Sequence, residues 1–256
     1  MLEFRNVTTG YPGAPVSEGL SLRVTEGEIL TLIGPNGCGK TTLLKTAAGL
    51  LSPLVGQVRL EGREVKELAP RELARRRAYL PQGREVPDIT VGALVAHGRF
   101  PHLSFSRQMT ARDREAVERA MEWTGAAQWK NRRLATLSGG QRQQVYLAMT
   151  VAQDTPLLLW DEPATYLDVN HRLAILELVR KLNREGRTVV MTLHDLADAL
   201  TVSHRVALMD GAGRLVQVDS PEALFASGAI DRVFGMRSEQ VRLADGSAAY
   251  VFTNGE

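Results

Sequence analysis

The chain is poor in cysteine and aromatic residues, and neither sign of charge dominates. One cysteine in 256 residues excludes an internal disulfide framework. Lysine and arginine total 31 against 29 acidic residues, so the composition does not favour a nucleic-acid surface and we expect no nucleic-acid partner. No apolar run approaches the roughly 20 residues of a membrane span. The first residues lack the pattern of a signal peptide, and we therefore expect a soluble, cytoplasmic protein.

The most specific motif is a glycine-rich loop, Gly34-Pro35-Asn36-Gly37-Cys38-Gly39-Lys40-Thr41-Thr42. It follows an apolar run expected to be a strand, 29–33, and precedes a helix-like stretch, 43–48. Its glycines let backbone N–H groups face phosphate oxygens, because a Cβ would block the approach. Lys40 is expected to reach the β- and γ-phosphates and the Thr41 hydroxyl to hold Mg²⁺. An ordinary glycine-rich turn is the alternative, but Lys-Thr at this offset after a strand predicts a nucleotide site.

Two further predicted strands end in polar side chains. Residues 78–80 end at Pro81, so Gln82 begins a loop, where it can bind Mg²⁺ and orient an attacking water. A solvated loop amide is the alternative for Gln82. The apolar run 157–160 ends in Asp161 and Glu162, as expected for a buried parallel strand whose carboxyl end lies at the site.

The two adjacent carboxylates are expected to do different work, because neighbouring residues on a strand point in opposite directions. Asp161 can position Mg²⁺ through water, and Glu162 can polarise the water that attacks the γ-phosphate. A third buried strand, 188–193, delivers His194, which can donate a hydrogen bond to the γ-phosphate. We interpret the remaining histidines as structural or solvated; they are His97, His102, His171 and His204.

A second candidate anion site lies in a region that is helical from 83 to about 152. Helix starts are predicted at Asp88 or Thr90 and at Thr110. Leu137-Ser138-Gly139-Gly140-Gln141 then precedes another helix, so a hydroxyl and two glycine amides meet at its N-terminus. Alone this could be a simple helix cap. Because it follows the glycine-rich phosphate loop (P-loop) at 34–42, it indicates a second phosphate cradle. We expect this cradle to serve a nucleotide held by another copy of the chain.

The last third of the chain carries Leu167-Asp168 in a turn and then an amphipathic helix, 169–184. The expected apolar stripe of that helix is Leu173, Leu176, Val179 and Leu182. Two hairpins are predicted, at 206–218 and around Asp245-Gly246. Tyr11, in the turn-rich link 10–13, can stack on adenine through its ring, or it can be a packed loop aromatic.

Together these motifs stand in the order and approximate spacing of ABC ATPase nucleotide-binding domains, which the chain resembles over nearly its whole length. The resemblance implies an α/β fold: a RecA-like P-loop NTPase core with an antiparallel β subdomain and an inserted α-helical lobe. It implies head-to-tail dimers that enclose two ATP, each between one chain's P-loop and the other chain's Ser138-Gly139-Gly140. It also makes Tyr11 the residue that stacks on adenine.

These expectations assign residues to three roles. The expected catalytic residues are Lys40, Gln82, Glu162 and His194. The expected ligands of Mg²⁺ are Thr41, Gln82 and Asp161. The expected contacts to ATP are Tyr11, Gly34, Pro35, Asn36, Gly37, Cys38, Gly39, Lys40, Thr41, Thr42, Ser138, Gly139, Gly140, Gln141 and Asp168. We expect one ABC ATPase domain over 1–256, with its core at 1–84 and 153–235, a helical lobe at 85–152 and a C-terminal hairpin extension at 236–256.

A narrower resemblance rests on three stretches, 98–102, 163–168 and 192–196, which look like the ATPases of iron-siderophore, haem and vitamin B12 importers. It implies separate transmembrane permease subunits, a substrate-binding protein as an indirect partner, and a peripheral place on the cytoplasmic face of the plasma membrane. The sequence departs from this family at Ala164, where Thr is usual, and at Trp160, where Leu or Ile is usual.

Two other classes remain as alternatives. A soluble ABC ATPase of DNA repair or translation usually carries coiled-coil or zinc insertions or a second ATPase domain, and this sequence shows none. An exporter or lipid-extraction ATPase would differ mainly around Phe100 and Leu167-Asp168.

One reactivity is also expected: Cys38 lies near a helix N-terminus, where a thiol pKa can fall, so alkylation should block ATP binding. The alternative is that Cys38 is only a small tolerated residue.

Overall fold

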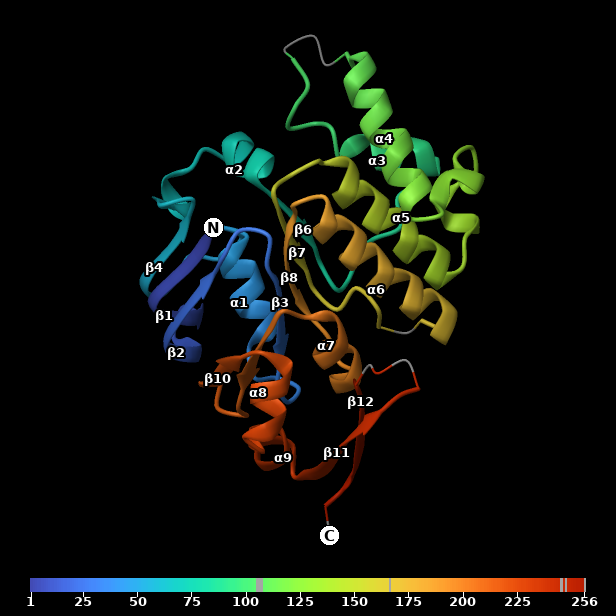
Figure 1. Cartoon of the computed structure of the whole chain (residues 1–256). Helices are drawn as coiled ribbons and strands as arrows, with labels where there is room; N and C mark the ends of the chain where they lie inside the picture. Colours follow the sequence, from blue (N-terminus) through green and yellow to red (C-terminus); the bar gives the residue numbers. More distant parts are fainter. Residues whose placement is uncertain (105–107, 166, 245, 247, 256) are drawn as a thin grey trace.

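A six-stranded, largely parallel sheet lies at the centre of the protein (Figure 1). The computed structural model describes residues 1–104, 108–165, 167–244, 246 and 248–255. The strand order is β10-β9-β3-β8-β7-β6, and β10 alone among these strands runs antiparallel to its neighbour. The strands are β3 (Ile29–Ile33), β6 (Arg77–Leu80), β7 (Leu157–Trp160), β8 (Thr188–Thr192), β9 (Arg205–Met209) and β10 (Leu215–Asp219).

Both faces of this sheet are buried, which is why its central strands are continuous apolar runs. In β3, Leu30 and Leu32 pack into the core on one side, and Ile29 and Ile33 pack into the core on the other. The predicted buried strands are therefore confirmed. Because β3, β6, β7 and β8 are parallel, their carboxyl ends lie at one edge of the sheet.

An antiparallel sheet of order β2-β1-β4-β5 covers one face of the central sheet, with α1 between the two (Figure 1). Helix α1 contacts β1 on one side and β7 and β8 on the other. The elements are β1 (Leu2–Tyr11), β2 (Ala14–Val24), α1 (Lys40–Ala47), β4 (Val55–Leu60), β5 (Arg63–Glu64), η1 (Val65–Glu67) and α2 (Pro70–Arg76).

A group of helices covers the other face and projects beyond the sheet. Thr90, Thr110 and Ser138 each cap the helix that follows with a side-chain oxygen, so the three predicted helix starts are confirmed. One apolar cluster runs from the sheet through α6 into these helices. The elements are α3 (Val91–His97), α4 (Ala111–Trp123), η2 (Ala126–Trp129), η3 (Leu134–Thr136), α5 (Gly139–Ala152) and α6 (Val169–Arg184).

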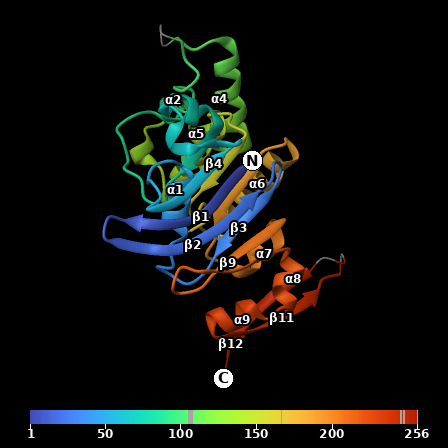
Figure 2. The same cartoon turned by 90° about the vertical axis from the view of Figure 1, so that its left-hand side faces the viewer.

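The C-terminal elements extend away from the antiparallel sheet (Figure 2). Hairpin β11–β12 packs on α7, and the Tyr250 ring lies 5.1 Å from that of Phe225 on α8. Both predicted hairpins are present, although the turn residue Asp245 lies outside the described residues. The elements are α7 (Leu196–Val202), α8 (Pro221–Ala226), α9 (Ala229–Phe234), β11 (Met236–Arg242) and β12 (Ala248–Asn254).

One local expectation is wrong. Leu173 is 52% exposed, so it does not belong to the buried stripe of α6, which runs through Ile175, Leu176, Leu178, Val179 and Leu182. The link at 10–13 holds a turn, as expected, and it is the tight end of a hairpin in which Tyr11 pairs with Ala14. The division of the chain into core, lobe and extension stays a prediction. No helix in the described part of the chain combines the length and apolar character that a membrane crossing requires.

A buried ion pair links two helices on the far side of the sheet. Arg99, just after α3, lies 2.9–3.0 Å from the Asp113 carboxylate in the first turn of α4, and it also donates to the carbonyl of Ala152 at 2.8 Å. Burial raises the pKa of Asp113, but hydrogen bonds from Thr110 and Arg99 outweigh burial and hold that pKa at about 2. The carboxylate is therefore ionised in the folded protein at any ordinary pH.

Replacing Asp113 by Ala should lower the free energy of unfolding by about 3 kcal/mol, because Arg99 would remain buried without its counter-charge. Urea denaturation at pH 7 measures the loss. Asp88→Ala is the matched control, because Asp88 pairs with Arg133 on the surface, where such pairs contribute at most about 1 kcal/mol. In the unsubstituted protein this stabilisation is present above pH ~4 and is lost as the pH falls toward 2. Equal losses for both variants would contradict the assignment.

Candidate nucleotide site

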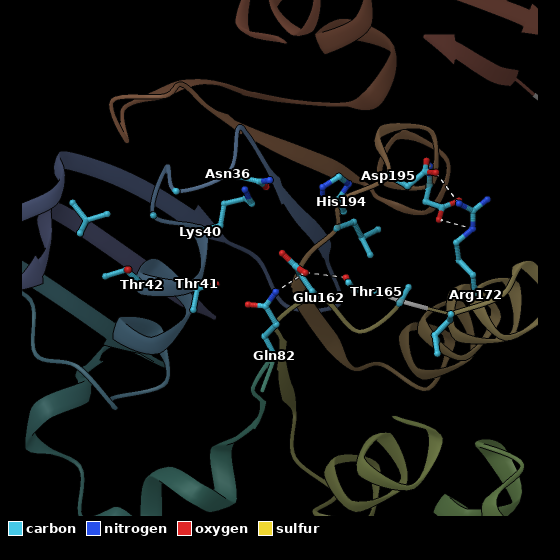
Figure 3. A pocket seen from close by; sticks show the side chains of 17 residues that line it. Asn36, Lys40, Thr41, Thr42, Gln82, Glu162, Thr165, Arg172, His194 and Asp195 are labelled. Carbon is cyan, nitrogen blue, oxygen red and sulfur yellow. Dashed lines mark hydrogen bonds and ion pairs between the residues drawn. The ribbon is translucent and has the colours of Figure 1, made fainter. Parts of the chain in front are cut away.

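The carboxyl ends of the central strands surround one large cavity of about 780 Å³ (Figure 3). Its walls come from the loop before α1, the loop after β6, the turn after β7 and the segment between β8 and α7. The lining residues are Val16, Asn36, Gly37, Gly39, Lys40, Thr41, Thr42, Gln82, Glu162, Ala164, Thr165, Leu167, Arg172, Leu193, His194, Asp195 and Asp198. Parallel strand order thus brings together motifs that lie up to about 160 residues apart in the sequence.

The glycine-rich loop joins β3 to α1 and requires glycine at its last turn. Gly39 has φ 100° and precedes the first residue of α1, and a Cβ at this position would lie 2.7 Å from a methyl carbon of Val16. The Lys40 ammonium donates to the carbonyls of Gly34 at 2.7 Å and Pro35 at 3.0 Å, so it folds back over the loop. A cation and the N-terminus of α1 therefore both face the cavity, as an anionic ligand needs.

Asp161 is the buried polar centre of the site. Its Oδ1 accepts hydrogen bonds from the hydroxyls of Thr41 at 3.0 Å and Thr192 at 2.9 Å. Its buried Oδ2 has no hydrogen-bond partner among the described residues. Burial raises the pKa of the Asp161 carboxyl, although the two threonine hydroxyls oppose the shift. An unpaired carboxylate oxygen beside a threonine hydroxyl fits the oxygen-rich environment that Mg²⁺ prefers.

The side chains of Asp161 and Glu162 have different surroundings, but not because they alternate along a strand, as was expected. Strand β7 ends at Trp160, and Glu162 adopts a left-handed backbone with φ 49°, so a turn and not strand alternation separates the two carboxylates. The Glu162 amide donates to the Thr192 hydroxyl at 2.8 Å. Its Oε2 accepts from Gln82 at 2.8 Å and from Thr165 at 2.9 Å (Figure 3). Gln82 and Glu162 thus meet in the cavity.

His194 also reaches the cavity, together with a charged group that the sequence analysis missed. Arg172 on α6 contacts the carboxylates of Asp195 at 2.7 Å and Asp198 at 3.3 Å (Figure 3). Asp195 is the N-cap of α7, so this contact ties the start of α7, directly after His194, to α6. The pKa of Asp198 is raised by burial and by the neighbouring Asp195. Asp195 beside His194 was the only local signal for this group.

Several predicted contact residues lie outside the cavity. Tyr11 is 47% exposed at the end of β1. Ser138 caps α5 and accepts from the Gln141 amide, and Asp168 caps α6. Gly34, Pro35, Gly139 and Gly140 do not line the cavity either. Their expected contacts to ATP stay predictions.

Cys38 faces the interior of the protein. It is 1% exposed, and a Cβ on Gly34 would lie 2.8 Å from its sulfur. The burial opposes the expected reactivity, because an alkylating reagent reaches this thiol only when the loop opens. The loop therefore presents backbone groups, and not this side chain, to the cavity.

The two departures from the importer pattern have separate surroundings. Trp160 is fully buried, and its indole N–H donates to the Thr150 hydroxyl on α5 at 3.2 Å. The large ring thus connects the central sheet to α5. Ala164 lines the cavity and contributes no polar group there.

Asp161→Asn should raise the free energy of unfolding at pH 7 in metal-free buffer. A raised folded-state pKa means that the ionised carboxylate disfavours the folded state, and Asn can still accept from Thr41 and Thr192. The gain should shrink as the pH falls below about 4, where the carboxyl in the unfolded chain is also protonated. Urea denaturation of both proteins in parallel measures this difference. Asp88→Asn on the surface is the control, and a loss of stability in Asp161→Asn would refute the explanation.

Comparisons with known proteins agree with this geometry. The family model described as ABC transporter matches residues 17–165. The chain is 41% identical over 239 residues to the ferric enterobactin transport ATP-binding protein FepC of Escherichia coli K12, covering 92% of this chain and 88% of the relative. It is 41% identical over 223 residues to the hemin import ATP-binding protein HmuV of Streptomyces coelicolor, covering 87% and 79%.

Among solved structures, a dimeric bacterial ABC transporter cassette, MJ0796, superposes with a TM-score of 0.78 at 26% identity and covers 86% of this chain and 99% of that one. The P-loop ATPase fold and the family resemblance predicted from the motifs are both confirmed. The chain belongs to the ABC transporter family, as one of the ATP-binding subunits that hydrolyse ATP to drive transport.

Proposed function

We propose that this chain powers a binding-protein-dependent importer of an iron(III)-siderophore or a related metal chelate such as haem or cobalamin. The observation that carries the proposal is high identity, over most of the chain, to two import or transport ATP-binding proteins with cargoes of this class. The name of the second relative, a hemin import protein, favours import over the export and lipid-extraction alternatives.

The cavity supports a specific division of work in ATP hydrolysis. Lys40 would bind the β- and γ-phosphates as a point charge, once ATP replaces the two carbonyls that it now contacts. Glu162, held by Gln82 and Thr165, would orient the attacking water and accept its proton. His194 would donate to the γ-phosphate. Mg²⁺ bound by Thr41, Gln82 and the free oxygen of Asp161 would neutralise phosphate charge.

A second copy of the chain would complete the site. Ser138 and the two following glycines form the N-terminus of α5, a 14-residue helix whose start does not line this chain's own cavity. Asp168 likewise lies on the surface at the start of α6. We propose that each ATP lies between one chain's P-loop and the other chain's Ser138, so that ATP closes the dimer and hydrolysis releases it.

Separate permease subunits would dock beside the helical region. Phe100 is 58% exposed, with its ring 4.5 Å from that of His97, and Val86 is exposed in the same segment. We propose that residues 83–102 line the cleft that receives permease loops. This contact would hold the chain peripherally on the cytoplasmic face of the plasma membrane.

Glu162→Gln should reduce ATP turnover at least about 100-fold, because an amide cannot accept the proton of the attacking water. The variant should still bind ATP and should accumulate as a dimer in size-exclusion chromatography with ATP and Mg²⁺. Thr253→Ala on the C-terminal hairpin is the control and should keep the turnover of the unsubstituted protein. Hydrolysis by Glu162→Gln at the unsubstituted rate would refute the role proposed for Glu162.

A cysteine placed at Phe100 should cross-link to a permease loop in the reconstituted importer, whereas one at Val251 on the hairpin should not. The native Cys38 is buried and gives little background. The cargo is identified by measuring ATP turnover of the same complex with binding protein loaded with ferric siderophore, haem or cobalamin. The loaded compound that raises the turnover is the cargo. Equal cross-linking at both positions would contradict the proposed docking cleft.

A further inference from the structure

Arg84 is a positively charged residue beside the cavity. None of the catalytic, metal-binding or ATP-binding roles predicted from the sequence was assigned to it. Its Nε donates to the carbonyl of Pro81 at 2.8 Å, and its Nη1 donates to the side-chain oxygen of Gln143 on α5 at 2.7 Å. The guanidinium lies 4.8 Å from the ring centroid of Tyr146, also on α5. Among the described residues, none of its hydrogen-bond partners is a carboxylate. Burial lowers the pKa of Arg84 to about 10, so the group remains charged at neutral pH.

The partners of Arg84 lead back to the two residues that meet in the cavity. Gln143 donates through its amide nitrogen to the carbonyl of Pro163, the residue after Glu162. On the other side Pro81 directly precedes Gln82, which donates to Glu162 at 2.8 Å. These hydrogen bonds and the peptide bonds between neighbouring residues form a closed ring. Hydrogen bonds join Gln82 to Glu162, Pro163 to Gln143, Gln143 to Arg84 and Arg84 to Pro81, and the chain itself joins Glu162 to Pro163 and Pro81 to Gln82.

The ring is attached to α5 at two points. Gln143 and Tyr146 are three residues apart and so face the same side of the helix. The Tyr146 hydroxyl donates to the carbonyl of Glu85, directly after Arg84. The loop after β6 is thus joined to α5 by two hydrogen-bonding side chains and one cation–π contact. Helix α5 is the helix that Ser138 caps.

We propose that Arg84 is a positioning residue that holds Gln82 and Glu162 in their mutual geometry and couples both to α5. A planar guanidinium can donate in two fixed directions at once, here to Pro81 and to Gln143. A lysine ammonium keeps the charge but lacks this fork. The inference rests on the role proposed for Glu162, because Arg84 acts through that residue and does not touch the reacting atoms.

The test compares steady-state ATP hydrolysis of Arg84→Met, Arg84→Lys, Gln143→Met and the Arg84→Met/Gln143→Met double variant in the full-length chain. Arg84→Met should lower kcat about tenfold and leave KM for ATP within about twofold, because positioning affects turnover more than binding. Gln143→Met should have a similar effect, and the double variant should lose no more than the worse single variant, because both act in one ring. Arg84→Lys should recover only part of the loss.

Arg133→Met is the matched control, because Arg133 is a surface arginine of the same helical region that pairs with Asp88. Its kcat should be unchanged. An unchanged kcat in Arg84→Met, multiplicative losses in the double variant, or full activity in Arg84→Lys would each overturn the proposal. Thermal unfolding of every variant accompanies the kinetics. If Arg84→Met unfolds, the role of Arg84 is decided by the kcat of Arg84→Lys and by whether Gln143→Met lowers kcat while leaving KM for ATP nearly unchanged.

Glu162→Gln, measured beside these variants, separates two kinds of failure. If that variant loses turnover and Arg84→Met does not, only the role of Arg84 fails. If Glu162→Gln keeps its turnover, the role proposed for Glu162 fails, and the positioning argument fails with it.

Discussion

The carboxylate of Asp161 is the interaction around which the site is arranged. One of its oxygens joins the end of β7 to the start of α1 through Thr41 and to the end of β8 through Thr192. The Thr192 hydroxyl also accepts from the Glu162 amide, so the same contact fixes the position of the next carboxylate. A buried carboxylate disfavours folding unless it is well bonded, and this cost accounts for the two hydroxyls directed at it. The site thus places a destabilising charge where a cation can be held.

The rest of the site depends on connections between the central sheet and the helices beyond it. Trp160 connects β7 to Thr150 on α5 within the apolar core, and the partly buried Arg84 connects the loop after β6 to the same helix. Arg99 fixes α4 and the end of α5 to the segment after α3. These polar contacts are directional, whereas the apolar cluster around them is not. They can therefore define how α5 sits on the sheet.

Local patterns in the sequence predicted much of this arrangement. Helix α6 begins and ends at the expected residues, and the capping residues of α3, α4 and α5 were found because a cap is specified within four residues. The strand ends carrying Gln82, Glu162 and His194 followed from apolar runs and parallel topology. Each of these features is encoded close to where it occurs.

What the sequence could not reveal depends on contacts between distant segments. The Arg84–Gln143 and Arg172–Asp195 pairs join residues 59 and 23 positions apart, and no periodicity marks them. Leu173 looked buried because α6 is amphipathic, but the buried stripe is turned around the helix toward Ile175 and Leu178, which leaves Leu173 exposed. The left-handed backbone at Glu162 was missed because turn geometry after a strand is not specified by the run before it.

The order of the central strands also has a consequence for synthesis of the protein on the ribosome. Strand β3, which leads into the nucleotide loop, lies between β8 and β9, and its partners include Val189 and Arg205. About 150 residues must be made after β3 before either neighbour exists, so the backbone N–H and C=O groups along both of its edges lack their strand partners through most of translation. The nucleotide loop can therefore reach its final conformation only near the end of translation. A nascent chain that pauses before β8 therefore leaves both edges of β3 without their partner strands.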